Sequence, residues 1–269
     1  MRAAPPIAMF CRLPIALLAV LLAGCAATER LPALPSACDD GYGWLDEATG
    51  PAELSFRAAL LALDVYDRPD GLGLPPGLRR DSLVENPQTG FAAAVYSYGS
   101  EPVAVAFRGT SPLSARDWVF GNALALQNGE GQALLDAVRE TAGPERHVFV
   151  TGHSLGGAIA LSASYRTPKT PAFAFDASFR YTKGPEVDNV RVLVSSDGEV
   201  LAPLRGLRSA ADRERRIQAC GGGNAFSKHD MRKLALCLTQ VAAIHHADAR
   251  AVLERNGIGR AYGACPDRR

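Results

Sequence analysis

The sequence lacks an excess of charge of either sign. Its 269 residues contain 29 Lys and Arg against 28 Asp and Glu, which gives a formal net charge of +1. A nucleic-acid-binding protein normally has a marked basic excess, so the balance argues against a nucleic-acid partner. Hydrophobic residues make up 47% of the chain and charged residues 21%, which excludes wholesale disorder. Internal repeats and low-complexity segments are also missing, and one large globular domain is therefore expected.

A hydrophobic run long enough to cross a bilayer comfortably is missing too. Ile15–Ala23 is apolar throughout but short, and it follows a start that contains Arg2 and Arg12 and no acidic residue. A short apolar run behind a basic start is typical of an export signal, and an uncleaved membrane anchor is the alternative. The end of this run together with the next two residues, Leu22–Cys25, resembles the lipobox of bacterial lipoproteins.

The lipobox resemblance implies cleavage before Cys25, which becomes an acylated N-terminus. Buried acyl chains would hold the protein on a membrane surface. Ala26 and Ala27 directly follow Cys25, and the absence of Asp at these two positions favours the outer membrane by analogy with enteric sorting rules, while the face that the protein occupies stays open. We therefore divide the chain into a signal peptide (1–24), a lipidated cysteine with a proline-containing tether (25–51) and a folded domain (52–269).

Cysteines are too few to build the fold by themselves. Cys11 leaves with the signal and Cys25 carries lipid. The others are Cys38, Cys220, Cys237 and Cys265. In an oxidising compartment four cysteines allow three pairings, of which we favour Cys220–Cys237 and Cys38–Cys265; buried free thiols are the alternative. No pair shows the spacing of a zinc finger, and we expect no metal site.

Short apolar runs alternate with segments of helical periodicity along the exported part. The predicted helices are Ala52–Tyr66, Gly129–Thr141, Leu155–Tyr165 and Asp230–Glu254. The predicted strands are Phe91–Tyr98, Val103–Phe107, His147–Thr151, Ala172–Phe175 and Val190–Val194, the first two forming a hairpin. Asp67–Pro87, rich in Gly, Pro and Arg, is predicted to be a loop. This alternation predicts an α/β fold, a mostly parallel central sheet with helices on both faces.

The strongest chemical motif is Gly152–Gly156, which fits G-x-S-x-G. A predicted strand precedes it and a predicted helix follows. A sharp strand-to-helix turn lifts Ser154 above the sheet edge, and glycines on both sides avoid steric clashes. Ser154 is therefore the candidate nucleophile.

A serine hydroxyl needs a base within hydrogen-bond reach, and the base needs a carboxylate to orient it. In α/β-hydrolases these groups follow in the order Ser, Asp or Glu, His. Asp197 comes shortly after the last predicted strand and is our preferred acid. Asp176, directly after the strand Ala172–Phe175, is the second choice, with a turn or helix cap as its more ordinary interpretation.

His229 is the predicted base because it lies in a polar loop downstream of both carboxylates. His147 and His153 precede Ser154 in the chain and break the expected order. His245 and His246 fall within a predicted helix, where packing or solvation explains them.

These residues resemble the motifs of the class 3, or fungal-type, lipases within the α/β-hydrolases. Phe107–Thr110 resembles the F-R-G-[ST] strand end of that family, Asp117-Trp118 its [DN]-W pair, and Gly152–Gly157 its G-H-S-L-G-G elbow. Val194–Val200 resembles its strand-then-D-x-V segment, and Phe226–Asp230 its aromatic-x-x-His segment. The resemblance extends from about Phe107 to about His229.

The resemblance implies an oxyanion hole formed by Thr110 and by the backbone N–H of Leu155. The latter points off the first turn of a helix, where unpaired donors favour an anion. By the same resemblance the helix beginning near Ser114 is a lid, with Trp118, Phe120 and Leu124 as candidate lid residues. A helix permanently packed in the core is the alternative.

Together these features predict a lipid-anchored serine esterase or lipase that acts on lipid acyl esters through Ser154, Asp197 and His229, without a cofactor. A phospholipase or thioesterase with the same triad is one alternative. A non-catalytic envelope lipoprotein that kept the fold is another. The arginines between Arg205 and Arg216 are interpreted as a solvated helix face, with contact to anionic lipid as the alternative.

Overall fold

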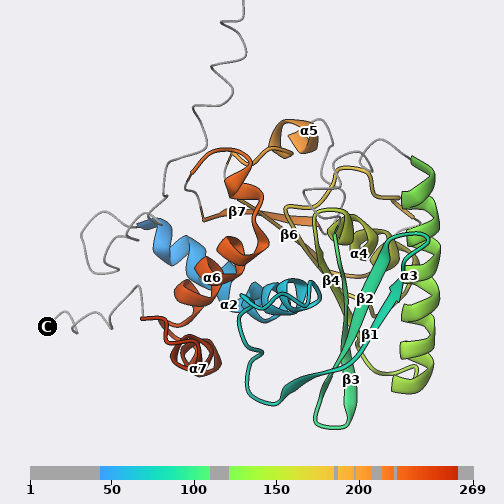
Figure 1. The fold of residues 1–269 in the computed structure, drawn as a ribbon, viewed down its shortest axis with the longest axis horizontal. Helices are drawn as coiled ribbons and strands as arrows, with labels where there is room; N and C mark the ends of the chain where they lie inside the picture. Colours follow the sequence, from blue (N-terminus) through green and yellow to red (C-terminus); the bar gives the residue numbers. More distant parts are fainter. Residues whose placement is uncertain are drawn as a thin grey trace, which may run out of the picture. The chain divides into compact units, whose positions relative to one another are not determined.

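A twisted sheet forms the centre of the domain (Figure 1). The computed structural model describes residues 43–109, 121–184, 187–196, 198–206, 214–220 and 223–259. Within them, seven strands lie side by side in the order in which they occur in the chain. They are β1 (Leu78–Asn86), β2 (Phe91–Tyr98), β3 (Glu101–Phe107), β4 (Phe149–His153), β5 (Ala172–Phe175), β6 (Arg191–Ser196) and β7 (Glu214–Ala219).

The sheet is mostly parallel, as predicted. Strands β1 to β3 form an antiparallel meander, and β3 to β7 are parallel. In the parallel part Phe107 pairs with Gly152, and His153 pairs with Phe175. The carboxyl ends of β3, β4 and β5 therefore meet at one edge of the sheet, which is where open α/β sheets place their functional residues.

Helices cover both faces of the sheet, because alternate strand residues are apolar on both sides (Figure 1). The described helices are α2 (Gly43–Asp64), α3 (Gly121–Ala142), α4 (Leu155–Arg166), α5 (Ala202–Gly206), α6 (Met231–Ala242) and α7 (Ala247–Arg255), with a 3₁₀ turn, η2, at Ser227–His229. Val192 and Val194 pack in a buried cluster with α2, α6 and α7. Leu193, between them, packs in a cluster with α3 and α4. This arrangement is the α/β-hydrolase fold class that the sequence predicts.

Three predicted strands and one helix lie close to their expected bounds. Strand β5 matches its predicted range, β2 and β3 form the predicted hairpin, and α4 begins at Leu155 as expected. Helix α2 instead begins at Gly43 and runs through Pro51, which was expected to precede it. A proline removes one intrahelical hydrogen bond, and here the helix continues on both sides of it.

The prediction of a loop over Asp67–Pro87 is wrong in its second half. Residues 78–86 form the edge strand β1, which pairs with β2 from Leu78↔Tyr98 to Asn86↔Phe91. The side chains of this strand are largely exposed or half-buried. An edge strand needs a backbone partner on one side only and no buried face, so it carries little hydrophobic signal.

The C-terminal segment was predicted as one helix and is two. Helix α6 ends at Ala242 and α7 begins at Ala247. Between them, the N–H groups of Ile244 and His245 bond to carbonyl oxygens three residues earlier, which forms a turn. Both helices pack on one buried cluster, so the reversal keeps each apolar face covered.

The expected solvated helix face over Arg205–Arg216 is also wrong in part. Glu214–Ala219 is strand β7, which extends the parallel sheet beside β6. Its charged sequence gives no period-2 apolar pattern, and pairing with β6 decides its conformation. No helix in the described part of the chain is long and apolar enough to cross a membrane.

Candidate active site

Ser154 occupies a strained turn between β4 and α4. Its backbone has φ 57° and ψ −120°, a conformation that residues with a side chain rarely adopt. The Ser154 N–H donates to the Phe175 carbonyl at 2.9 Å, which holds the turn against β5. A Cβ atom on Gly156 would overlap the Phe107 carbonyl oxygen. The close approach of β3 therefore requires glycine at position 156. The strained backbone of Ser154 is typical of functional sites.

His229 lies against Ser154, as the sequence predicts. Its Nε2 is 3.1 Å from the Ser154 Oγ, although the two residues are 75 positions apart. His229 ends the short turn η2, and its N–H donates to the Phe226 carbonyl. The next residue, Asp230, caps α6 by accepting hydrogen bonds from the N–H groups of Arg232 and Lys233. The imidazole is thus held between a turn and a capped helix start.

The carboxylate that contacts His229 belongs to Glu199. Its Oε2 lies 2.8 Å from His229 Nδ1 and also accepts a hydrogen bond from the Leu201 N–H at 2.9 Å. Glu199 is 1% exposed, so the contact is shielded from water. A second hydrogen bond, from the Val200 N–H to the Ala225 carbonyl, joins the loop of Glu199 to the loop of His229.

This geometry corrects the expected choice of acid. The preferred Asp197 lies outside the described residues, and His229 Nδ1 is already occupied by Glu199. Asp176, the second choice, is fully buried and accepts hydrogen bonds from Ser196 N–H and Oγ. The chain order of the triad in α/β-hydrolases, Ser then Asp or Glu then His, also permits Glu199 as the acid. Sequence reasoning missed it because a turn after β6 separates the carboxylate from the strand end.

A second histidine and a tyrosine lie behind the pair Ser154–His229. The ring of His153 is 4.7 Å from that of His229, centroid to centroid. The Nδ1 of His153 is 2.9 Å from the hydroxyl of Tyr66, which follows α2. Burial raises the pKa of Tyr66, and a hydrogen bond from the backbone of Gly109 acts against that rise. Tyr66 is therefore a neutral phenol that links α2, the end of β3 and the elbow; no motif in the sequence pointed to it.

Of the two residues assigned to the oxyanion hole, the structure describes Leu155 and not Thr110. Leu155 is the first residue of α4, where backbone N–H groups have no acceptor within the helix. Thr110 lies outside the described residues, but Gly109 before it lies against Ser154: a Cβ on Gly109 would be 3.2 Å from that of Ser154. Strand β3 thus ends beside Ser154.

The expected lid is largely outside the described part of the chain. Trp118 and Phe120 fall there, and Leu124 belongs to α3, which begins at Gly121. The lid therefore remains a prediction. Cys25, Cys38 and Cys265 also lie outside the described residues.

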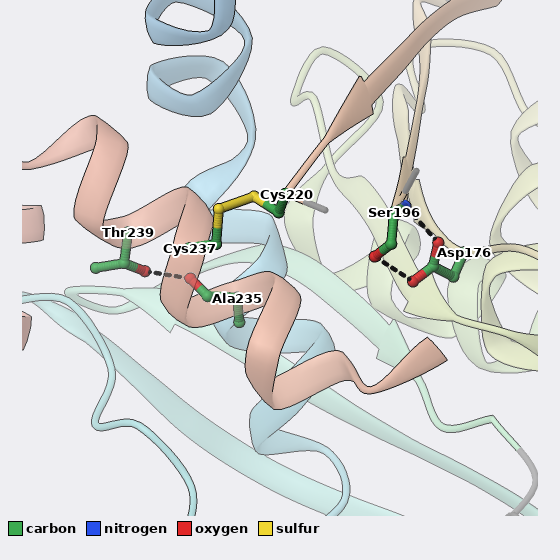
Figure 2. The surroundings of a disulfide bond; sticks show 6 residues. All are labelled: Asp176, Ser196, Cys220, Ala235, Cys237 and Thr239. Atoms are coloured by element: carbon green, nitrogen blue, oxygen red, sulfur yellow. Dashed lines mark hydrogen bonds between the residues drawn. A yellow bond between two sulfur atoms is a disulfide. The ribbon is translucent and has the colours of Figure 1, made fainter. Parts of the chain in front are cut away.

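The predicted bridge between Cys220 and Cys237 is present. It joins the end of β7 to α6 with a Cα–Cα distance of 6.0 Å (Figure 2). The two cysteines are 17 positions apart, and the segment between them contains His229. The bridge therefore closes the loop that carries the imidazole.

One group of side chains near the elbow has the composition of a metal site. Ligand atoms of His153, Asp176 and His229 all lie within 4.8 Å of one another. Both ring nitrogens of His229 already contact other side chains, Ser154 and Glu199. A metal at this position would have to displace one of these contacts.

Comparisons with known proteins relate part of the chain to a phospholipase-like family. The model of a phospholipase-like family, the Tle-like phospholipase domain, matches residues 57–180, less than half of the chain. No curated protein matches the sequence. The matched segment contains Ser154 and ends before Glu199 and His229.

Solved lipase structures are similar at low sequence identity. Lipase II from Rhizopus niveus is 16% identical with a TM-score of 0.45, covering 59% of this chain and 77% of that chain. A triacylglycerol lipase from Penicillium expansum is 13% identical with a TM-score of 0.40 (63% and 79% covered). The triacylglyceride lipase of Rhizomucor miehei is 19% identical with a TM-score of 0.42 (59% and 75% covered). Part of the chain, residues 57–180, is thus similar to a phospholipase-like family.

Proposed function

We propose that the protein is a serine hydrolase that cleaves carboxylic esters of lipids. The observation that carries this proposal is the continuous contact from Ser154 Oγ to His229 Nε2 and from His229 Nδ1 to Glu199, at 3.1 and 2.8 Å. A hydroxyl, an imidazole and a buried carboxylate in this order make the hydroxyl nucleophilic at neutral pH. The strained elbow and the start of α4 support the same role for Ser154.

In the proposed reaction His229 Nε2 takes the proton of Ser154 as Oγ attacks the ester carbonyl carbon. Glu199 holds the Nδ1–H and stabilises the imidazolium. The oxyanion is held by the Leu155 N–H and, on the family resemblance, by Thr110. His229 then gives its proton to the leaving alcohol, and an acyl group remains on Ser154. Water, deprotonated by His229, attacks the acyl-enzyme and releases the carboxylic acid.

Two observations support a lipid as the acyl donor, and one of them favours phospholipids. Phe226, in the loop that leads to His229, is 78% exposed, and Leu204 on α5, just after Glu199, is 40% exposed. Large apolar side chains beside both catalytic loops suit contact with an apolar substrate or a lipid surface. The match of residues 57–180 to a phospholipase-like domain makes glycerophospholipid esters the preferred substrate class.

The N-terminal sequence supports export and lipid anchoring as a further part of this proposal. Acylation at Cys25 would place the hydrolase on a membrane, next to phospholipid. Mass spectrometry of the mature N-terminus tests this: we expect a diacylglyceryl-modified Cys25, and an unmodified, soluble chain from the Cys25→Ser variant. An intact Met1 terminus on the membrane-bound protein would contradict cleavage.

The proposed chemistry is tested by fluorophosphonate labelling of the full chain in detergent micelles, beside the Ser154→Ala variant. We expect labelling of the parent and none of the variant. Hydrolysis of phospholipid vesicles, a triacylglycerol emulsion and a soluble short-chain ester is measured on the same samples. A folded parent that is neither labelled nor active would reject the hydrolase and favour a non-catalytic binding role. Activity on triacylglycerol alone would reject the phospholipid preference.

A further inference from the structure

We propose that Tyr66 is a positioning residue that holds both members of the pair Ser154–His229 in place. This role rests on the proposed function, because it concerns the same nucleophile and base. In this role Tyr66 contacts neither the substrate nor the reacting atoms. Its hydroxyl acts through two neighbours: Gly109, which lies against Ser154, and His153, whose ring lies against that of His229.

The packing of the Tyr66 ring limits where its hydroxyl can lie. Tyr66 comes two residues after the end of α2, and its N–H donates to the Leu63 carbonyl at 3.1 Å. Its side chain is half-buried and packs against two apolar clusters, one that includes residues of α6 and α7 and one that includes residues of β2 and β3. The ring is therefore fixed between helix and sheet, and the hydroxyl is held at a defined point near the elbow.

The first contact of the hydroxyl is with the end of β3. Up to Arg108 the strand is held by β2, where the Arg108 N–H donates to the Ala92 carbonyl at 2.9 Å. One residue further, the backbone of Gly109 forms a hydrogen bond with the Tyr66 hydroxyl. A Cβ placed on Gly109 would lie 2.7 Å from that hydroxyl oxygen, which shows how closely the two approach. A side-chain hydroxyl thus takes the place of a strand partner at this point.

The end of β3 forms one wall of the space around Ser154. The same Cβ on Gly109 would lie 3.2 Å from the Ser154 Cβ and would overlap the His153 carbonyl oxygen. Gly109 therefore packs directly against the elbow, with no room for a side chain between them. Without the Tyr66 hydroxyl the end of β3 can shift, and the side chain of Ser154 gains freedom to turn away from His229.

The second contact of the hydroxyl is with the ring of His153. Its Nδ1 lies 2.9 Å from the Tyr66 oxygen, and the two rings meet edge to face with centroids 6.1 Å apart. The His153 ring also packs on the His229 ring, at 4.7 Å between centroids. Packing and hydrogen bonds from neighbouring side chains are what lock the rotamers of a catalytic group. Tyr66 thereby restrains the ring on which the imidazole of His229 rests.

The reaction depends on a short distance between nucleophile and base. Ser154 Oγ and His229 Nε2 are 3.1 Å apart, which is within reach of proton transfer. A displacement of about 1 Å in such an arrangement can cost about 10²-fold in rate. Loss of the Tyr66 hydroxyl releases the neighbours of both groups at once and removes no contact with the substrate. The effect is therefore expected in kcat and not in KM.

Tyr96 provides a matched control. Its hydroxyl also ties α2 to the sheet, since it donates to Asp64 at 2.8 Å and lies 3.4 Å from the Leu61 carbonyl oxygen. Both partners belong to α2, and neither belongs to the elbow or to the loop of His229. Tyr96→Phe should therefore lower the stability of the protein without moving the catalytic pair.

The test compares Tyr66→Phe with Tyr96→Phe in the full chain. We measure the melting temperature, kcat and KM on a soluble short-chain ester, and the rate of fluorophosphonate labelling of Ser154. Both variants should melt at a lower temperature than the parent. We expect Tyr66→Phe to lose about 10- to 100-fold in kcat and in labelling rate, with KM within about twofold of the parent. Tyr96→Phe should keep kcat within about threefold.

A double-mutant cycle tests the route through His153. His153→Phe keeps an aromatic ring beside His229 and removes the nitrogen that contacts Tyr66. If the hydroxyl acts through this ring, Tyr66→Phe should cost at least about threefold less kcat in the His153→Phe background than in the parent. Additive losses would overturn the part of the role that is assigned to His153.

The outcomes separate the role of Tyr66 from the proposed function. A kcat of Tyr66→Phe within about twofold of an active parent would overturn the role and leave the hydrolase intact. Equal losses of kcat in Tyr66→Phe and Tyr96→Phe would also overturn it, because the loss would then follow stability. A parent that is neither labelled nor active would overturn the hydrolase, and the role with it.

His153→Phe keeps the role testable if Tyr66→Phe does not fold. This variant breaks the contact with the hydroxyl from the other side and leaves Tyr66 in place. A lowered kcat with an unchanged KM would support the role, and an unchanged kcat would overturn it.

Discussion

At the scale of single residues, the orienting acid is where sequence and structure differ most. Glu199 follows Asp197 by two positions, and both come after the same strand. The contact of 2.8 Å with His229 and the hydrogen bond from the Leu201 N–H give Glu199 a defined orientation. The turn after β6 decides which of the two carboxylates reaches the imidazole of His229. The sequence does not reveal the shape of that turn.

We predict that Glu199→Gln lowers kcat/KM by about 10⁴-fold, because an amide no longer stabilises the imidazolium or holds the tautomer with a proton on Nδ1. Asp197→Asn is the matched control, and it should change kcat/KM by no more than about threefold. The measurement is ester hydrolysis at saturating and limiting substrate. A larger loss in Asp197→Asn than in Glu199→Gln would return the role of acid to Asp197.

At the scale of elements, the site is assembled where three loops meet. The elbow between β4 and α4 carries Ser154, the turn after β6 carries Glu199, and the turn η2 before α6 carries His229. Strand pairing holds the first two loops in place. The third depends on the Asp230 cap and on the bridge between Cys220 and Cys237. The position of the imidazole is therefore coupled to the covalent link across its loop.

We predict that reduction of this bridge, or replacement of both cysteines by serine, lowers the free energy of unfolding by about 3 kcal/mol. A closed loop of this length has roughly that effect in the chain-entropy model. The melting temperature should fall by roughly 6–12 °C, and labelling of Ser154 should weaken at temperatures where the parent remains folded. Calorimetry and fluorophosphonate labelling with and without reductant give both values.

The double serine variant serves as the control for the reductant, because any further effect of reductant on it would come from the predicted Cys38–Cys265 bridge. Unchanged melting of the parent on reduction would contradict a structural role for the bridge.

At the scale of the whole molecule, two tyrosines tie α2 to the sheet: Tyr96 is buried and Tyr66 is half-buried. The hydroxyl of Tyr96 on β2 donates to Asp64 at 2.8 Å, and Tyr66 contacts His153. Burial raises the pKa of both phenols, and for Tyr96 the charge of Asp64 adds to the effect. The folded protein therefore keeps both protons at a pH where the unfolded chain has lost them.

We predict a loss of stability at alkaline pH from this difference. Below about pH 10, the ordinary value for tyrosine, both states are protonated and the stabilisation is fully present. As the pH rises further, unfolding releases protons, and each tyrosine lowers the free energy of unfolding by up to about 1.4 kcal/mol per pH unit. Urea unfolding between about pH 9 and 11 measures the slope. Tyr66→Phe should reduce that slope, and an identical slope in this variant would exclude Tyr66 as a cause.

The sequence by itself determined the parts of this protein that depend on local patterns. Short stretches of residues each indicate the elbow around Ser154, the proposed base His229, the hairpin of β2 and β3, and the alternation of strands and helices. Sequence reasoning favoured the pairing of Cys220 with Cys237 among three possible pairings, and the structure contains this bridge.

Only the tertiary structure decided the rest, because it depends on contacts between distant segments. The edge strand β1 and the charged strand β7 form by pairing with neighbours and carry little pattern of their own. The predicted C-terminal helix divides where α7 packs back on the core. Glu199 and Asp176 approach His229 because three loops converge at one sheet edge. The effect of a buried carboxylate depends on the groups around it, and only the folded chain brings those groups together.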